Sequence, residues 1–474
     1  MDNKLIARQS ELSTLKDAVL DNKSHFIAVY GRRRIGKTFL VREAFNHRFT
    51  FQHAGLAKGT MSEQLTVFAD SIRDTGYEYD RRPQNWIEAF NLLKEVIKNS
   101  SEKKKVVFID ELSWMDTPKS RLIVALEHFW NGWASDRDDV VLIVCASATS
   151  WMLSNVIHNK GGLYNRLTEQ IHLNPFSLSE CEEYVKSENI VFTRDQILQF
   201  YMIFGGVPYY WTFLKKGRSL TQNIDSILFA KDAPLQDEFK YLYASIFRNP
   251  TVHLKLISAL GKKKAGMTRE ELIRESGLSN SGDLTAKLEE LESCGFIRKY
   301  TAFGMKSKNA VYQLIDSFTL FYYRFMENRP TDEHFWSSQI NTPTVNTWIG
   351  LAFERVCLLH ADKIKEKLGI SGVHTDINSW YCAANPDEGI LGSQIDLLIV
   401  RADHVINMCE MKYSASEYVI TDKADKSIKR KVHDLITATK TKYAVHPTLI
   451  TCHGVLNNAY SNDIQAVITL DDLF

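Results

Sequence analysis

The sequence predicts an α/β protein with a parallel-sheet core, a helical lid, a winged-helix-like domain and a second α/β domain. Short apolar runs at 26–30, 106–109 and 140–145 alternate with helical patterns, as in a buried parallel sheet. A glycine-framed loop follows the first run and opens a helix. A two-strand pattern near 395–413 begins another sheet region. We expect domains at residues 1–175, 176–245, 246–330 and 331–474.

Composition describes an ordinary globular chain of 474 residues, long enough for two to four domains. With 58 Lys and Arg against 57 Asp and Glu, the overall charge argues neither for nor against nucleic acid. No apolar run has the length of a membrane span, and the first residues lack a signal-peptide core. The seven cysteines are scattered without a CxxC pair, so we expect no disulfide framework, no zinc site and a cytoplasmic location.

Residues 31–38, Gly-Arg-Arg-Arg-Ile-Gly-Lys-Thr, have the spacing of a phosphate-binding loop. Glycines let backbone N–H groups approach phosphate oxygens, and the following helix adds partial positive charge. Lys37 can reach the β- and γ-phosphates, and Thr38 can place its hydroxyl on Mg²⁺. A glycine-rich turn before an ordinary helix is the alternative, which the flanking strand and helix disfavour. The expected nucleotide-binding residues are Gly31, Arg33, Arg34, Ile35, Gly36, Lys37 and Thr38.

Two carboxylates end the apolar run at 106–109. Doubly wound sheets bind ligands at the carboxyl ends of their strands. Asp110 is therefore expected to hold Mg²⁺ through its hydration shell, and Glu111 to polarise the attacking water. An aspartate and a glutamate at the end of an apolar run are common in strands without a function. Because this pair follows a phosphate-binding loop, we favour its role in metal binding and hydrolysis.

Three further features leave alternatives open. The small hydroxyl residues at 146–150 either sense the γ-phosphate or cap a helix. Arg166 follows a glycine pair and either reaches the phosphates of its own or a neighbouring subunit, the latter in a homo-oligomer, or does neither. Pro208 either ends a helix in a simple turn or packs near a base from the helical lid.

Residues 251–325 predict a winged helix, with three helices and a two-strand wing. In DNA readers the third helix enters the major groove, but here it is acidic and would be repelled by phosphates. The lysine run at 262–264 and the wing lysines Lys306 and Lys308 could still contact a DNA backbone. We favour a structural role over DNA binding.

Local patterns also predict helices over 5–20 and 348–368, a capping box at Ser179 and Glu182, and a linker over 328–346. The helix over 348–368 places Glu354 inside an apolar stripe, where a carboxylate needs a partner.

A second candidate site lies on the hairpin at 395–413. Side chains alternate along a strand, so Glu410 and Lys412 face the same way, beside Asp396. Asp396 and Glu410 could bind Mg²⁺, with Lys412 orienting a hydroxide for phosphodiester cleavage. A cross-strand ion pair is the alternative.

The segments GRRRIGKT, VVFIDELSWM, CASATSWM, GGLYNR and FGGVPYY, in this order, resemble the archaeal-type ATPases, near the signal-transduction ATPases with numerous domains. The likeness covers most of residues 5–250. It implies ATP rather than GTP as the nucleotide, and it implies that Pro208 lies close to the adenine.

The C-terminal region resembles the restriction-endonuclease-like domain often fused to these ATPases. That pattern is an inward helix Glu, a strand Asp and then E-x-K, positions filled here by Glu354, Asp396, Glu410 and Lys412. Ile395 replaces the proline often found before the aspartate. The resemblance implies an ATPase whose nucleotide state controls a metal-dependent nuclease acting on DNA. The alternatives are a signalling or scaffold ATPase whose nuclease-like domain only binds a partner, and a DNA-binding regulator.

Overall fold

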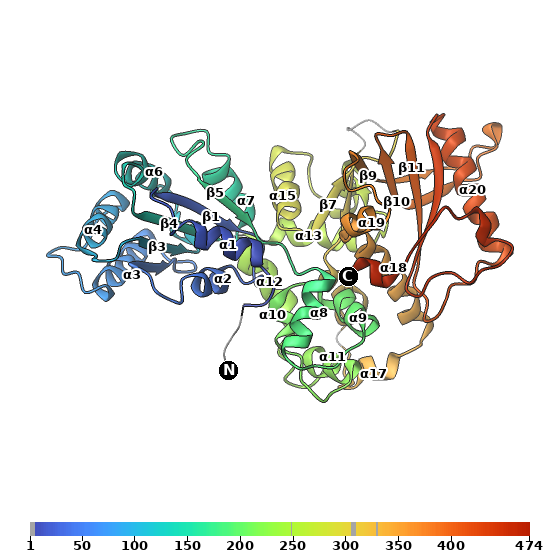
Figure 1. Cartoon of the computed structure of the whole chain (residues 1–474), viewed down its shortest axis with the longest axis horizontal. Coiled ribbons are helices and arrows are strands. Elements are labelled where there is room, and N and C mark those ends of the chain that lie inside the picture. The colour runs from blue at the N-terminus through green and yellow to red at the C-terminus, as the bar shows by residue number, and fades with distance from the viewer. Residues whose placement is uncertain (1–4, 248, 305–309, 329) are drawn as a thin grey trace. The chain divides into compact units, whose positions relative to one another are not determined.

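The computed structural model describes residues 5–247, 249–304, 310–328 and 330–474 (Figure 1). The chain divides into two compact units. The first comprises Met1–Pro175 together with Ala244–Arg248, and the second comprises Phe176–Tyr243 together with Asn249–Phe474. Each unit contains its own five-stranded sheet and its own core.

A parallel sheet with strand order β2-β3-β4-β1-β5 forms the centre of the first unit. Its central strands are buried on both faces, as their unbroken apolar runs require. This sheet, together with a separate C-terminal sheet, confirms the predicted α/β class. The strands are β1 (His25–Tyr30), β2 (Phe51–Ala54), β3 (Lys105–Asp110), β4 (Val140–Ala146) and β5 (Glu169–His172).

Helices cover both faces of this sheet (Figure 1). The helices are α1 (Gln9–Asp17), α2 (Lys37–Ala44), α3 (Met61–Asp74), α4 (Trp86–Asn99), α5 (Leu112–Met115), α6 (Leu122–Gly132), η1 (Ala134–Asp136), α7 (Thr149–Met152) and η2 (Leu153–Ile157). Successive residues of β1 point to opposite faces. Phe26 and Ala28 join the core under α3, α4 and α6, whereas Ile27 and Val29 join the core under α1 and α2.

The first helix is shorter than the predicted helix over 5–20, which was wrong at both ends. Ala7 and Arg8 have positive φ angles, of 57° and 63°, which a right-handed helix cannot include. The helix therefore begins at Gln9 and ends at Asp17.

The second unit begins with a helical segment: α8 (Leu178–Ser187), α9 (Arg194–Phe204), α10 (Pro208–Trp211), α11 (Leu220–Leu228) and α12 (Glu238–Ile246), the last crossing the boundary between the units. The capping box of α8 is formed by Ser177 and Glu180, so the prediction at Ser179 and Glu182 was wrong by two residues. Glu182 instead pairs with Arg194.

Between residues 251 and 314, the described part of the chain contains three helices and a small antiparallel sheet of order β6-β8-β7. The winged-helix assignment of this region stays a prediction. The wing lysines Lys306 and Lys308 lie outside the described residues. The elements are α13 (Thr251–Gly261), β6 (Met267–Thr268), α14 (Arg269–Ser276), α15 (Gly282–Ser293), β7 (Ile297–Tyr300) and β8 (Val311–Leu314).

The predicted linker over 328–346 was wrong for much of its length. The stretch after β8 contains α16 (Ser317–Phe321), η4 (Tyr322–Met326) and α17 (Phe335–Gln339). Trp336 of α17 is buried, and its backbone N–H donates to the buried Asp225 at 2.8 Å. Aromatic packing with Phe321 and Trp348 holds this stretch to the unit.

The C-terminal sheet has the order β13-β12-β11-β10-β9. The predicted hairpin is present, because β10 and β11 pair antiparallel. The predicted helix over 348–368 is two helices that meet at His360, whose ring accepts a hydrogen bond from the backbone N–H of Leu178. The elements are α18 (Pro343–Leu359), α19 (Ala361–Lys367), β9 (Thr375–Cys382), η5 (Pro386–Glu388), β10 (Ser393–Arg401), β11 (Val405–Lys412), α20 (Asp422–Thr439), β12 (Ala444–Thr451), η6 (Ser461–Asp463), β13 (Ala466–Ile468) and η7 (Leu470–Leu473).

All seven cysteines are free thiols. Within the residues that the structure describes, no helix is both long and apolar enough to cross a bilayer.

Candidate functional site

The loop between β1 and α2 requires its glycines. Gly31, Arg34 and Gly36 have positive φ angles, of 140°, 71° and 90°. A Cβ atom on Gly31 would lie 2.3 Å from the carbonyl oxygen of Leu173, so only glycine fits there. Ile35 anchors the loop by burying its side chain in the core under α1 and α2. The loop therefore has a fixed shape that leads directly into the first turn of α2.

Lys37 is the first residue of α2, and its side chain is buried. Its ammonium group donates to the carbonyl oxygens of Gly31 at 2.9 Å and Arg32 at 3.0 Å, and to the hydroxyl of Ser147 at 3.2 Å. The positive charge is thereby held inside the loop, beside the positive end of the helix dipole. This is a suitable arrangement for binding a phosphate group.

Thr38 and Asp110 meet at the carboxyl edge of the sheet. The hydroxyl of Thr38 donates to Oδ2 of Asp110 at 2.6 Å, and Oδ1 of Asp110 accepts from the backbone N–H of Glu111 at 2.9 Å. Hard oxygen donors at this spacing fit Mg²⁺, which prefers oxygen ligands and is commonly held by one or two carboxylates together with substrate phosphates.

Glu111 lies beside this pair with a left-handed backbone conformation, φ 48°. Both of its carboxylate oxygens accept from Ser147: Oε1 from the hydroxyl at 2.5 Å and Oε2 from the backbone N–H at 3.2 Å. Burial raises the pKa of Glu111, and the hydrogen bonds from Ser147 and the charge of Lys37 offset only part of that rise. A carboxylate with a raised pKa is a better proton acceptor, as a general base requires.

The structure does not bring every predicted nucleotide residue to this edge. Arg166 lies just before β5, which runs parallel to β1. The nearby backbone N–H of Thr168 donates to the carbonyl oxygen of Phe26, close to the start of β1. Arg166 therefore lies at the amino edge of the sheet, opposite the loop. Pro208 opens α10 in the other unit, and its predicted place near adenine stays a prediction. Arg33 is half-buried on the loop itself.

A second cluster of charges lies on the C-terminal hairpin. The carboxylate of Glu410 pairs with Lys412 at 2.8 Å and with Lys431 of α20 at 2.6 Å. Burial alone would raise the pKa of Glu410, but the two ammonium groups outweigh it and lower that pKa. Burial opposes the charge of Lys412, yet Glu410 raises the pKa of that lysine above its usual value.

Glu354 and Asp396 converge on a different lysine. Nζ of Lys264 lies 2.5 Å from Oε2 of Glu354 and 3.7 Å from Oδ2 of Asp396. Burial and the neighbouring carboxylate of Asp396 raise the pKa of Glu354, and Lys264 lowers it in part. The partner that the sequence required for Glu354 is thus a lysine from residues 251–314.

The predicted metal ligands Asp396 and Glu410 therefore have separate lysine partners. Across the described residues, no group of three or more His, Cys, Asp or Glu side chains is arranged to hold a metal ion. Each carboxylate supplies oxygen ligands of the kind Mg²⁺ prefers, but ammonium groups compensate their charge. The metal-binding role of this cluster remains a prediction.

Sequence reasoning placed neither Lys264 nor Lys431 beside these carboxylates, and it gave Ser147 only a general role. Ser147 was one of five small residues after β4, and only the structure singles it out as the link between Lys37 and Glu111. Lys264 belonged to a noted basic run, and Lys431 lies in a basic stretch of α20. The only available signal for either lysine was a local excess of positive charge.

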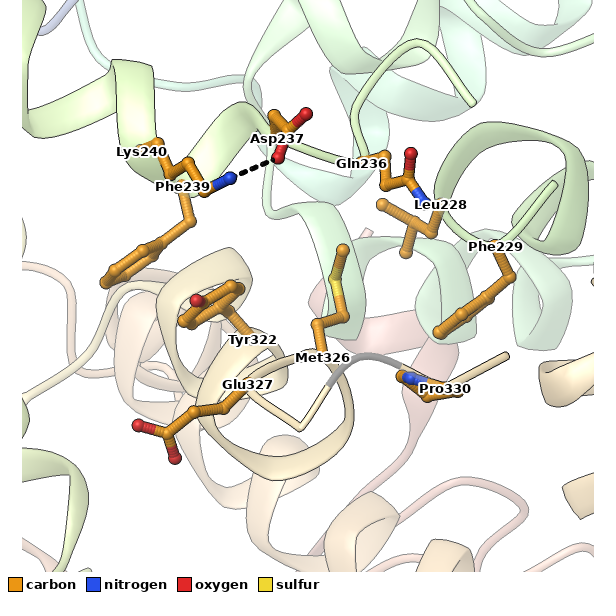
Figure 2. Close-up of a pocket in the computed structure, with 10 residues that line it drawn as sticks. All are labelled: Leu228, Phe229, Gln236, Asp237, Phe239, Lys240, Tyr322, Met326, Glu327 and Pro330. Atoms are coloured by element: carbon orange, nitrogen blue, oxygen red, sulfur yellow. Dashed lines mark hydrogen bonds and ion pairs between the residues drawn. The ribbon is translucent and has the colours of Figure 1, made fainter. Parts of the chain in front are cut away.

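A cavity of about 130 Å³ lies in the helical part of the second unit (Figure 2). Phe239 stacks on Tyr322 with ring centroids 3.8 Å apart, and Lys240 pairs with Asp237 at its rim. The cavity is smaller than the roughly 300–1,000 Å³ typical of ligand pockets, and none of the predicted site residues lines it.

Comparison with known proteins identifies the first part of the chain. Residues 5–213 match the family described as an ATPase domain predominantly from Archaea. Residues 5–213 are therefore similar to an ATPase domain of the archaeal type, the resemblance that the sequence predicted.

Relatives extend over more of the chain at low identity. An uncharacterized protein of Methanocaldococcus jannaschii, MJECL04, is 24% identical over 439 residues, which cover 92% of each chain. Among solved structures, the Walker-type ATPase PABY2304 of Pyrococcus abyssi has a TM-score of 0.46 at 15% identity, covering 68% of this chain and 97% of that one. The ORC2 protein of Aeropyrum pernix, solved as ADPNP–ADP complexes, has a TM-score of 0.41 at 14% identity, covering 76% of this chain and 98% of that one.

Proposed function

We propose that this chain binds ATP with Mg²⁺ in the loop of residues 31–38 and hydrolyses it with the help of Glu111. The observation that carries the proposal is the meeting of Lys37, Thr38, Asp110 and Glu111 at one edge of the parallel sheet. A glycine turn without function would not need a buried lysine beside a paired hydroxyl and carboxylate.

Each residue has a role in this proposal. Backbone N–H groups from Gly31 to Gly36 and the ammonium of Lys37 bind the phosphates. Thr38 and Asp110 hold Mg²⁺, which when bound neutralises charge on the β- and γ-phosphates. Glu111 orients the attacking water and accepts its proton. The hydrogen bonds from Ser147 lower the pKa of Glu111, so release of Glu111 from Ser147 would make it a stronger proton acceptor during catalysis.

Calorimetry with ATP tests the binding step. Lys37→Ala is expected to weaken ATP binding about 10- to 100-fold, because one charge-assisted hydrogen-bond donor is worth roughly 1.5–3 kcal/mol. The exposed Lys16 of α1 supplies a control, and Lys16→Ala should bind ATP like the parent. If the parent binds no ATP, or Lys37→Ala binds as the parent does, the proposal is wrong.

We further propose that nucleotide state controls a metal-dependent nuclease activity of the C-terminal domain on DNA. The gathering of Glu354 and Asp396 around one cation, with Glu410 beside Lys412, supports this assignment. Incubation of the protein with Mg²⁺ and DNA, with ATP or a non-hydrolysable analogue, tests it. Cleavage that Lys412→Ala abolishes is expected; no cleavage in any nucleotide state contradicts it.

A signalling or scaffold ATPase is the second candidate. It is favoured by one observation: Glu410 is already compensated by two ammonium groups, Lys412 and Lys431. In that case Lys412→Ala changes no enzymatic property of the protein, and the C-terminal sheet serves only to bind a partner.

A further inference from the structure

Lys264 lies in the turn between α13 and β6, yet its side chain reaches the acidic pair of the C-terminal domain. Its ammonium is 2.5 Å from Glu354 on α18 and 3.7 Å from Asp396 on β10. One ammonium group thus contacts two carboxylates from two different elements, and the buried guanidinium of Arg355 also interacts electrostatically with both. The side chain of Asp396 has a further contact, from the amide of Gln394 at 2.8 Å.

The backbone of Lys264 is held in place independently of its side chain. Its carbonyl oxygen accepts from Nη2 of Arg355 at 2.5 Å and from Nε2 of Gln313 at 2.8 Å. Both donors are buried, with 5% and 2% of their surfaces exposed. The next carbonyl, of Ala265, accepts from the hydroxyl of Tyr300 at 2.9 Å. These contacts aim Lys264 at the acidic pair through main-chain atoms that any residue would supply.

The neighbouring lysine shows what an ordinary surface lysine does here. Lys263 pairs with Glu271 at 2.6 Å, inside residues 251–314 and away from the acidic pair. The two lysines are adjacent in sequence and equal in charge, but only Lys264 reaches the acidic pair.

We propose that Lys264 is a built-in competitor for a divalent cation: its ammonium occupies the cation position between Glu354 and Asp396, and the site takes up Mg²⁺ or Mn²⁺ only when residues 262–266 withdraw. This inference rests on the proposed metal-dependent function of the C-terminal domain and adds its regulation. A bound Mg²⁺ requires oxygen ligands at about 2.0–2.1 Å, so it cannot share this space with the ammonium. Withdrawal of residues 262–266 would break the contacts of Lys264 with Arg355 and Gln313 together.

The test is Mn²⁺ binding to the full chain without nucleotide, measured by the electron paramagnetic resonance signal of free Mn²⁺. Lys264→Met keeps the length of the side chain and the main-chain contacts but removes the charge. We expect it to bind Mn²⁺ at least tenfold more tightly than the parent, with loss of that gain in Lys264→Met/Asp396→Asn. Lys264→Arg and Lys263→Met should resemble the parent.

The melting temperature supplies a second readout, because an ion that binds only the folded chain raises the melting temperature. Mn²⁺ should raise the melting temperature of Lys264→Met and leave that of Lys264→Arg unchanged. This comparison also shows whether Lys264→Met is folded before metal is added.

Two results would overturn the inference, and they differ in whether the metal site itself is also excluded. If the parent already binds Mn²⁺ in an Asp396-dependent manner as tightly as Lys264→Met, Lys264 does not compete, but the metal site remains. If folded Lys264→Met shows no Asp396-dependent Mn²⁺ binding, both the competition and the metal site are wrong.

Discussion

The hydroxyl of Ser147 donates a 2.5 Å hydrogen bond to Oε1 of Glu111 while its oxygen accepts from the ammonium of Lys37 at 3.2 Å. One side chain immediately after β4 thus links the group proposed to bind phosphate with the group proposed to activate water. Phosphate entering beside Lys37 would compete for the same ammonium protons, so nucleotide binding and release of Glu111 are expected to be coupled.

Glu111→Gln should separate binding from hydrolysis. Glutamine keeps the shape but cannot accept a proton, so kcat should fall by about 10²- to 10⁴-fold while ATP affinity stays within a few-fold of the parent. Steady-state phosphate release and calorimetry measure the two quantities. The partly exposed Glu95 supplies the control Glu95→Gln, and equal kcat in parent and Glu111→Gln would remove Glu111 from the mechanism.

The pH dependence of kcat/KM should report the raised pKa of Glu111. Only the ionised carboxylate accepts a proton, so activity is lost as pH falls, with an acid limb above the usual carboxyl value of 4.5. Hydrogen bonds from Ser147 lower the pKa of Glu111, so Ser147→Ala should move that limb to still higher pH. Ser154→Ala, at an exposed serine, should leave it unchanged; a limb that does not move in Ser147→Ala contradicts the coupling.

Gly31→Ala should destabilise the first unit by more than the backbone strain of a positive φ angle, because the added Cβ also clashes with a neighbouring carbonyl oxygen. At φ 140° the new Cβ would lie 2.3 Å from a carbonyl oxygen. Gly76 has φ 82° with nothing within 4 Å, so Gly76→Ala measures the cost of positive φ, about 1–2 kcal/mol. A lower melting temperature in Gly31→Ala than in Gly76→Ala is expected by thermal denaturation, and equal values would mean that the loop relaxes.

Glu410→Gln should lower the melting temperature near neutral pH, because it leaves Lys412 and Lys431 without their shared carboxylate. The folded-state pKa of Glu410 lies below its unfolded value, so its stabilisation is present above the unfolded pKa and disappears as pH falls through the folded pKa. The difference between parent and variant should therefore shrink below about pH 4.5. Glu366→Gln, at a more exposed pair, is the control, and a pH-independent difference would contradict the ion-pair explanation.

Arg166→Ala tests whether a neighbouring copy contributes to hydrolysis. The residue is exposed at the amino edge of the sheet, away from the loop of its own chain. If it serves another subunit, the specific ATPase rate of the parent rises with protein concentration, and that rise is lost in Arg166→Ala while ATP affinity is kept. A concentration-independent rate that Arg166→Ala does not alter would exclude this role.

Local chemistry made much of the first unit predictable. A phosphate-binding loop is eight consecutive residues between a strand and a helix, so spacing alone was enough to predict phosphate-binding roles for Lys37 and Thr38. Unbroken apolar runs predicted buried parallel strands, and parallel strands bring their carboxyl ends together, which placed Asp110 near the loop. Alternation along a strand likewise predicted that Glu410 and Lys412 share a face, and the two are paired.

The errors arose where distant residues override local pattern. Positive φ angles at Ala7 and Arg8 shorten the first helix, and a break at His360 divides a continuous helical pattern in two. Asp225 stabilises the start of α17 within a stretch whose polar composition predicted a linker. In each case a hydrogen bond to a distant residue accompanies the change, from Arg8 to Asn174, from Leu178 to His360 and from Trp336 to Asp225.

By itself the sequence determined the fold class, the phosphate-binding loop and the acids at the ends of the strands, because those features follow from spacing and apolar periodicity over a few residues. Only the tertiary structure decided which charges meet. Lys264 reaches Glu354, Lys431 reaches Glu410 and Ser147 joins Lys37 to Glu111, because folding brings together groups that lie far apart along the chain and carry no mark of their partner in the local sequence.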